Sequence, residues 1–143
     1  MKISLLEKKA KQFCLKNNLQ LTNPRKLVLN IIVNSKKPIK AYDILEKLSK
    51  SLNKPNPPTV YRAIDFWHKN NFIHRIESLN SYSACSSGNL HAGSQFLICD
   101  NCGKVMESDI IKFQEIIKNK FKNKTFKPSK WNLEITGSCN ECV

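Results

Sequence analysis

The sequence lacks any apolar run long enough to form a signal peptide or a membrane-spanning helix. Its opening stretch, MKISLLEKKAKQF, is interrupted by the charged residues Glu7, Lys8, Lys9 and Lys11. We therefore expect a cytoplasmic protein that makes no use of a membrane. Because cytoplasmic thiols stay reduced, closely spaced cysteines there indicate a metal site more often than a disulfide.

Acidic residues are scarce, with 11 Asp and Glu against 24 Lys and Arg in 143 residues, which gives a formal net charge of +13. An excess of this size favours a polyanionic partner, most often nucleic acid. The alternative interpretation is that the lysines are solvated surface residues of a protein from an AT-rich genome. The length suits one compact domain or two small ones, and a hydrophobic content of 41% supports a packed core.

The first half of the chain has the apolar periodicity of helices followed by a hairpin. Thr22 and Pro24 are typical of a helix start, and Pro38 marks a break. This order predicts a winged helix, in which the second helix of a helix-turn-helix enters the DNA major groove and the hairpin touches the backbone. The alternative is a generic small helical domain. The predicted helices cover residues 5–19, 22–37, 39–52 and 57–70, and the predicted strands cover 72–77 and 81–85.

The character of the sequence changes near Cys85, although no repeat or low-complexity linker marks the place. QFLICDNCGKVMES predicts two strands around a turn, residues 110–121 a helix, and KWNLEITGSC a strand whose buried face carries Trp131, Leu133 and Ile135. A unit this small needs a metal or a partner to complete its core. We therefore expect an α+β chain with a winged helix over residues 1–84 and a metal-stabilised unit over 85–143.

Two C-x-x-C pairs, Cys99 with Cys102 and Cys139 with Cys142, are the strongest chemical signal in the chain. Four thiolates at this spacing make a closed tetrahedral zinc site of the structural kind. Gly103 permits the tight turn that such a knuckle needs. The alternative is a redox motif of the thioredoxin type, but that chemistry uses one pair in a βαβ context rather than two pairs.

The remaining cysteines differ from each other. Cys14 lies on the apolar face of a predicted helix, where a thiol behaves as a small hydrophobic group. Cys85 lies where the hairpin meets a polar loop that contains His91, and the two hairpin strands can bring Cys85 close to His74. With a carboxylate added, these groups form a mixed nitrogen, sulfur and oxygen set that zinc accepts. Taken singly, each residue is more often an ordinary surface or core residue.

Six segments taken together resemble the ferric uptake regulator (Fur) family of metalloregulatory repressors, and most closely its zinc uptake regulator (Zur) branch. They are LTNPRKLVLNII, AYDIL, PPTVYRAIDF, FIHRIESLNSY, FLICDNCGKVMES and GSCNEC. The resemblance implies a homodimer, with no enzymatic activity, whose winged helices bind a palindromic double-stranded DNA operator. It also implies a dimerisation domain with a structural zinc on four cysteines, and a second zinc at the hinge that acts as corepressor.

The resemblance assigns roles to residues of this chain. His74, Cys85 and Glu107 match regulatory zinc ligands, and His91 is the candidate for the fourth, although counting back from Cys99 puts Ala92 at the family's position. Two zinc ions per chain are therefore expected. Tyr61 and Arg62 match the base-reading pair of the recognition helix, and the remaining expected DNA contacts are Thr59, Tyr42 and Arg25.

Three alternatives stay open. A regulator of iron or another metal is disfavoured because the chain has only three histidines and lacks a histidine cluster before Cys99, while Cys85 offers a thiolate. A zinc-stabilised DNA-binding protein without sensing would hold one zinc per chain instead of two. An oxidoreductase is disfavoured because no thioredoxin-like pattern surrounds either C-x-x-C pair.

Overall fold

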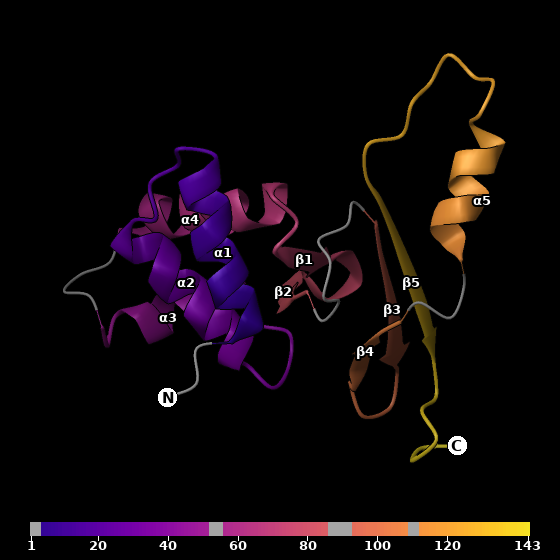
Figure 1. Ribbon diagram of the computed structural model, residues 1–143. Helices are drawn as coiled ribbons and strands as arrows, with labels where there is room; N and C mark the ends of the chain where they lie inside the picture. The colour runs from indigo at the N-terminus through magenta and orange to yellow at the C-terminus, as the bar shows by residue number, and fades with distance from the viewer. Residues whose placement is uncertain (1–3, 52–55, 86–92, 109–111) are drawn as a thin grey trace. The chain divides into compact units, whose positions relative to one another are not determined.

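The computed structural model describes residues 4–51, 56–85, 93–108 and 112–143, and His91 lies outside them. The chain forms two compact units, Met1–Leu90 and His91–Val143 (Figure 1). The boundary expected from the sequence lies between Ala84 and Cys85. Cys85 instead continues the first unit, because its backbone N–H donates a 3.0 Å hydrogen bond to the carbonyl of Phe72.

The first unit contains four helices: α1 (Leu5–Lys16), α2 (Asn23–Asn34), α3 (Ala41–Leu48) and α4 (Pro57–Lys69). Thr22, which predicted a helix start, does act as a cap, and Ser4 is a second cap that was not predicted. The Ser4 side chain accepts from the Glu7 N–H in a capping box, and Thr22 accepts from the Arg25 N–H one residue before α2. These caps fix where α1 and α2 begin.

All four helices are shorter than their predicted ranges, and for α1 and α3 the contacts at one end give the physical reason. Asn18 has a φ of 54°, a left-handed conformation, and the Leu19 N–H donates to the Cys14 carbonyl, which closes the end of α1. Ile39 does not belong to α3, because its N–H and carbonyl both bond to Tyr82 of the hairpin, at 2.9 and 2.8 Å. The N-terminal end of α3 is thereby tied to the hairpin.

The core of the first unit is built around α4. Its buried side chains recur at helical spacing: Val60, Ala63, Ile64 and Trp67. The Trp67 ring packs edge-on against Phe72 with ring centres 5.1 Å apart, and its Nε1 donates to the Arg25 carbonyl at 2.8 Å. This packing fixes which side of α4 faces away from the core.

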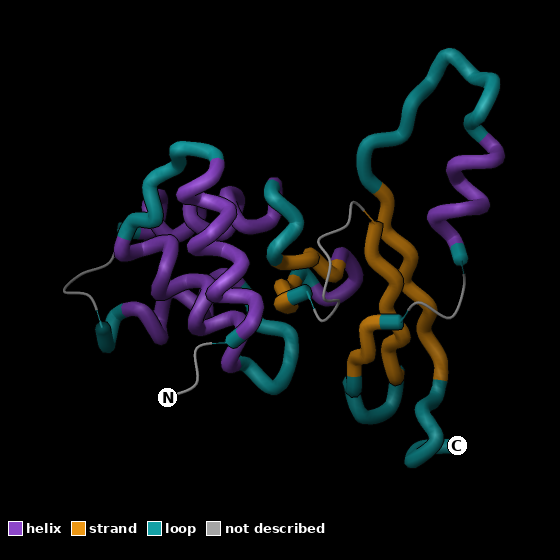
Figure 2. Tube along the Cα trace, viewed as in Figure 1, coloured by secondary structure: helices purple, strands orange, loops and turns teal. Residues whose placement is uncertain are grey.

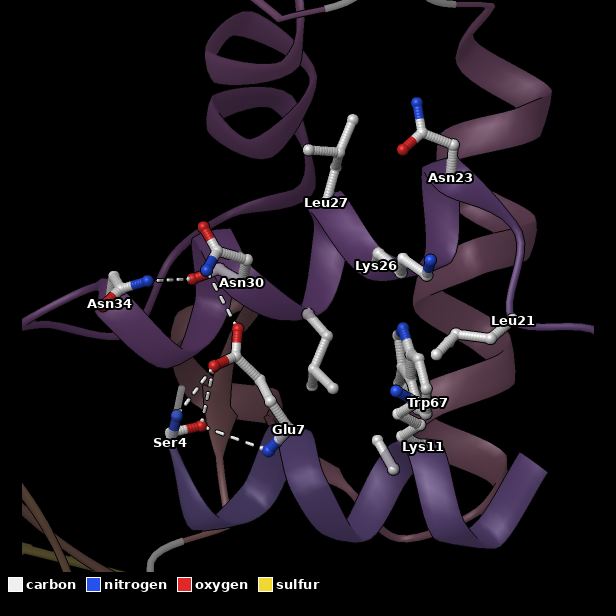
Figure 3. A pocket seen from close by; sticks show the side chains of 12 residues that line it. Ser4, Glu7, Lys11, Leu21, Asn23, Lys26, Leu27, Asn30, Asn34 and Trp67 are labelled. Atoms are coloured by element: carbon white, nitrogen blue, oxygen red, sulfur yellow. Dashed lines mark hydrogen bonds between the residues drawn. The ribbon is translucent and has the colours of Figure 1, made fainter. Parts of the chain in front are cut away.

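Helix α1 is fastened to α2 at one end by polar contacts, as Figure 3 shows. The Glu7 carboxylate accepts from the Ser4 N–H and from Asn30 Nδ2, each at 2.9 Å. A cavity of about 480 Å³ lies between the helices and extends to Trp67. Through its two hydrogen bonds, the Glu7 carboxylate connects the start of α1 to the middle of α2.

A two-stranded hairpin completes the first unit. Strands β1 (Ile73–Ile76) and β2 (Ser81–Ala84) are antiparallel, and a short 3₁₀ turn, Glu77–Leu79, joins them (Figure 2). Strand β1 ends before Glu77 because this residue enters the turn, which Asn80 closes with a left-handed φ of 46°. Strand β2 begins at Ser81 as predicted and ends one residue earlier, at Ala84. The four helices followed by the hairpin match the predicted winged-helix order.

The second unit is a three-stranded sheet with one helix. Strand β3 (Gly93–Cys99) lies between β4 (Val105–Glu107), which is antiparallel to it, and β5 (Trp131–Gly137), which is parallel. Helix α5 (Phe113–Lys120) lies between β4 and β5 in the chain. The predicted α+β class is confirmed.

The predicted buried face of β5 is wrong for the single chain. Trp131 and Leu133 are only half-buried, and Ile135 is 41% exposed. The buried apolar residues of this sheet lie on β3 instead, at Phe96 and Ile98. Other large apolar side chains of the unit are also exposed, namely Met106, Ile116, Phe121, Phe126 and Val143. Among the described residues, no helix is long and apolar enough to cross a membrane.

Candidate metal centres and DNA-binding face

The four-cysteine cluster is assembled by the pairing of two strands in the second unit. Cys99 ends β3, and the chain turns back through Gly103, whose φ of 76° is in the left-handed region. Parallel pairing sets Cys99 beside Gly137 of β5, and the Asp100 N–H donates to the Gly137 carbonyl at 2.8 Å. The second C-x-x-C pair is thereby brought to the first.

The geometry of this cluster fits a tetrahedral zinc ion. The sulfur atoms of Cys99, Cys102, Cys139 and Cys142 all lie within 4.8 Å of one another, and those of Cys102 and Cys139 are 3.7 Å apart. A zinc–sulfur bond of about 2.3 Å implies roughly 3.8 Å between sulfurs at tetrahedral corners. The structure therefore brings together all four residues that the spacing predicted.

The thiols of the cluster have divergent proton affinities. Backbone N–H groups of Cys102 and Cys139 stabilise the Cys99 thiolate and lower its pKa to about 6. Hydrogen bonding among the clustered thiols, first with Cys139, raises the pKa of Cys142 to about 12. A divalent cation would replace the shared protons and make all four groups thiolates.

His74 and Cys85 form a second candidate ligand group within the first unit. His74 lies on β1 opposite Ser83, and Cys85 follows β2 directly. Both are buried, at 5% and 6% exposure, and a ring nitrogen of His74 lies within 4.8 Å of the Cys85 sulfur. Such a pair supplies two of the ligands that zinc uses in mixed sites.

Of the other two predicted regulatory ligands, Glu107 lies among the described residues and His91 does not. Glu107, half-buried, ends β4 in the second unit. His91 lies outside the described residues.

Cys14, by contrast, is buried in the helical core, and burial raises the pKa of its thiol, as expected of an inert core cysteine.

The exposed side of α4 presents the predicted base-reading pair. Tyr61 is 50% exposed and Arg62 is also exposed, on the side opposite Val60 and Trp67. The helix begins with Pro57 and Pro58 and carries no acidic residue in its first turn. An arginine on such a face can contact guanine O6 and N7 together.

The other predicted DNA-contacting residues fall into two groups. Tyr42 on α3 is 71% exposed, and Thr59 at the start of α4 is half-buried. Arg25 makes contacts within the fold. Its guanidinium lies 3.8 Å from the centre of the Phe66 ring and donates to the Gln20 carbonyl at 2.6 Å. This packing role was not visible in the sequence, because Phe66 lies far along the chain.

Two ion pairs were also not predicted. Arg75 in the hairpin is 3.5 Å from Glu77 and donates to Asn80, so the one arginine of the hairpin is engaged within it. Lys104 and Glu141 are 3.7 Å apart and join the two cysteine knuckles. Nothing in the sequence pattern distinguished these charges from ordinary surface charges.

Comparisons with known proteins agree with this arrangement. The model of the ferric uptake regulator family matches residues 16–136. The zinc uptake regulation protein of Escherichia coli (strain K12) is 35% identical over 136 residues, which cover 94% of this chain and 79% of that protein. A structure of a zinc uptake regulator complexed with zinc and DNA superposes with a TM-score of 0.84 at 34% identity, covering 99% of this chain and 97% of that one. The crystal structure of holo XcZur gives 0.81, again at 34% identity, with 94% of each chain covered. The chain therefore belongs to the ferric uptake regulator family.

Proposed function

We propose that this protein is a zinc-responsive transcriptional repressor, not an enzyme, which binds palindromic DNA operators as a homodimer. The observation that carries the proposal is the buried pair of His74 and Cys85, in the same unit as the exposed Tyr61–Arg62 face. Relatives described as a zinc uptake regulation protein and as a regulator complexed with zinc and DNA support the same function. Binding to DNA operators places the protein in the cytoplasm, where cysteines stay reduced.

The winged helix supplies sequence recognition. Arg62 makes the bidentate contact to guanine, and Tyr61 touches the neighbouring base edge or a thymine methyl group. Tyr42 and Thr59 contact the backbone, where phosphate contacts set the register of the helix in the groove. Arg25 supports this face from within through its contact with Phe66.

Zinc is held at two places in each chain. Cys99, Cys102, Cys139 and Cys142 bind a structural ion, which would stabilise a unit that has few buried apolar residues. His74, Cys85 and Glu107 bind the regulatory ion, with His91 as the candidate fourth ligand. A thiolate in this set favours zinc over harder metals such as manganese or iron.

Regulation follows from where the regulatory ligands lie in the chain. His74 and Cys85 belong to the DNA-binding unit and Glu107 to the other, so shared coordination couples the two units. A coupling of roughly 1–3 kcal/mol is enough for a 5- to 150-fold change in operator affinity. Bound zinc thus needs only to favour one arrangement of the two units over the others.

Dimerisation is assigned to the second unit. Ile116 on α5, Ile135 on β5 and Met106 on β4 are between 41% and 46% exposed in the single chain. Apolar exposure of this kind on a small unit marks a surface that a second copy covers. A palindromic operator matches the resulting twofold symmetry.

Zinc counting combined with DNA selection tests the proposal. The purified protein is expected to hold two zinc ions per chain, and in their presence to select a palindromic sequence from a random duplex pool. Removal of the weaker zinc is expected to abolish this selection. One zinc per chain with unchanged selection would identify a constitutive DNA-binding protein, and a stronger response to iron than to zinc would contradict the choice of metal.

A further inference from the structure

The lysines of the second unit are gathered in one segment, residues 118–130. It contains six lysines and no acidic residue: Lys118, Lys120, Lys122, Lys124, Lys127 and Lys130. The rest of the unit, residues 91–117 and 131–143, carries two lysines and six acidic residues. A net charge of +6 in the segment thus stands against −4 elsewhere in the same unit. Scattered solvated lysines would not separate the charges in this way.

The fold presents this segment to solvent at one end of the unit. It covers the last turn of α5 and the irregular connection to β5, and each of its residues is exposed. In Figure 1 the connection forms the end of the unit opposite the chain terminus that carries Cys139 and Cys142. The segment is therefore separate from the four-cysteine cluster.

Stability of the helix explains only part of this charge. Lys118 and Lys120 lie in the last turn of α5, where cations interact favourably with the helix dipole. Lys122, Lys124 and Lys127 lie beyond the helix, and in the described part of the chain no carboxylate forms an ion pair with them. Like charges this close repel each other unless a polyanion neutralises them.

We propose that residues 118–130 form a second DNA-binding surface, which contacts backbone phosphates without reading bases. The proposal rests on the proposed function only in taking DNA as the partner. Lysine suits this role because its ammonium is a compact point charge on a flexible chain. The connection from Phe121 to Lys130 contains a single proline and no glycine. Phe126, 65% exposed and 5.8 Å from the Phe121 ring centre, anchors this connection against the end of α5.

The salt dependence of DNA binding tests this surface with the full-length, zinc-loaded protein. The probe is a mixed-sequence DNA duplex several helical turns long, so that no operator has to be known. The test variant is Lys122→Gln with Lys124→Gln, two loop positions outside α5. The matched control is Lys104→Gln with Lys112→Gln, which makes the same charge change in the same unit but outside the segment.

The slope of log affinity against log salt is negative, and each lost phosphate contact reduces its magnitude by about 0.9. The test variant removes two lysines from each chain, so it is expected to reduce the magnitude of the slope by about 2 for each subunit of the homodimer that contacts the duplex. Binding at low salt is expected to weaken at least tenfold, whereas the control keeps the wild-type slope. Equal slopes for wild type and test variant, in a protein that does bind duplex, would overturn the surface and leave the proposed function intact. A wild-type protein that binds no duplex would overturn both. Loss of RNA or anionic-vesicle binding with DNA binding unchanged would assign the segment to that other partner and also overturn the proposal.

Discussion

At the scale of single residues, exposure separates the side chains that stabilise the protein from those available to a partner. Trp67 and Val60 on one side of α4 are at most 2% exposed, whereas Tyr61 on the other is 50% exposed. A large aromatic ring left in water on a helix that also carries Arg62 adds nothing to the core. Its position is the one that the proposed contact with DNA requires.

Arg62→Ala is expected to remove most of the preference for operator over random DNA. One bidentate base contact supplies roughly 1–3 kcal/mol of discrimination, while the phosphate contacts that give nonspecific binding remain. Competition binding with the two DNAs measures the change, and Tyr61→Phe, which loses only a hydroxyl group, serves as the milder variant. An Arg62→Ala protein with the wild-type ratio of affinities would show that Arg62 does not read a base.

Glu7→Gln is expected to destabilise the first unit at neutral pH and to have little effect in acid. Burial raises the pKa of Glu7, but hydrogen bonds from Asn30 and Ser4 outweigh it, so the pKa lies below 4.5 in the folded protein. The stabilisation by the carboxylate is therefore present above the ordinary pKa and disappears as the pH falls through the lowered value. We expect a loss of about 1 kcal/mol at pH 7 in urea unfolding. The control is Glu46→Gln, at an exposed position of α3. An equal loss of unfolding free energy from Glu7→Gln at pH 3 and at pH 7 would contradict the stabilising role of the Glu7 carboxylate.

At the scale of elements, sequence periodicity located each of the helices, and the hairpin was predicted from strand alternation around Ser78–Asn80. Periodicity could not predict features that depend on residues far apart in the sequence. Ile39 has the spacing of a helical residue but pairs with Tyr82, more than forty positions along the chain. Ile135 has the spacing of a buried strand residue, yet its burial requires a surface that the single chain does not provide.

The candidate sites were predictable to different degrees for the same reason. The C-x-x-C spacing fixes a local geometry, so the four-cysteine cluster could be predicted completely. His74 and Cys85 required the additional assumption that the hairpin pairs in one particular register. The packing of Arg25 on Phe66 had no local signal, and the sequence offered only its possible contact with DNA.

Cys142→Ser is expected to unfold the second unit. The last residues of the chain follow β5 as a turn, and in the predicted holo form the zinc–thiolate bonds hold them to Cys99 and Cys102. Structural zinc contributes on the order of 10 kcal/mol in small domains, comparable to the whole stability of one. Zinc analysis together with sedimentation measures the loss of the ion and of the dimer. Glu141→Gln, which breaks only the exposed ion pair with Lys104, is the neighbouring control and should change stability by less than about 1 kcal/mol.

At the scale of the whole molecule, the proposed function assigns recognition to the first unit and assembly to the second, and it draws the ligands for the regulatory zinc from both. The first unit holds 16 Lys and Arg against five Asp and Glu, so most of the net charge of +13 belongs to the DNA-binding unit. Counterion release from DNA then supplies affinity that does not depend on zinc. Regulation must therefore act on specific binding, where the spacing of two recognition helices matters.

Operator affinity as a function of free zinc, measured for wild type and for Cys85→Ser, tests the regulatory assignment most directly. The probe is a duplex that the zinc-loaded wild-type protein selects from a random pool. Cys14→Ser, which changes another buried cysteine of the same unit, is the matched control. We expect wild type and Cys14→Ser to hold two zinc ions per chain and to tighten on this duplex by 5- to 150-fold as zinc rises. Cys85→Ser is expected to remain a folded dimer with one zinc per chain and an affinity that zinc no longer changes. A Cys85→Ser protein that still holds two zinc ions and still tightens with zinc would contradict the assignment.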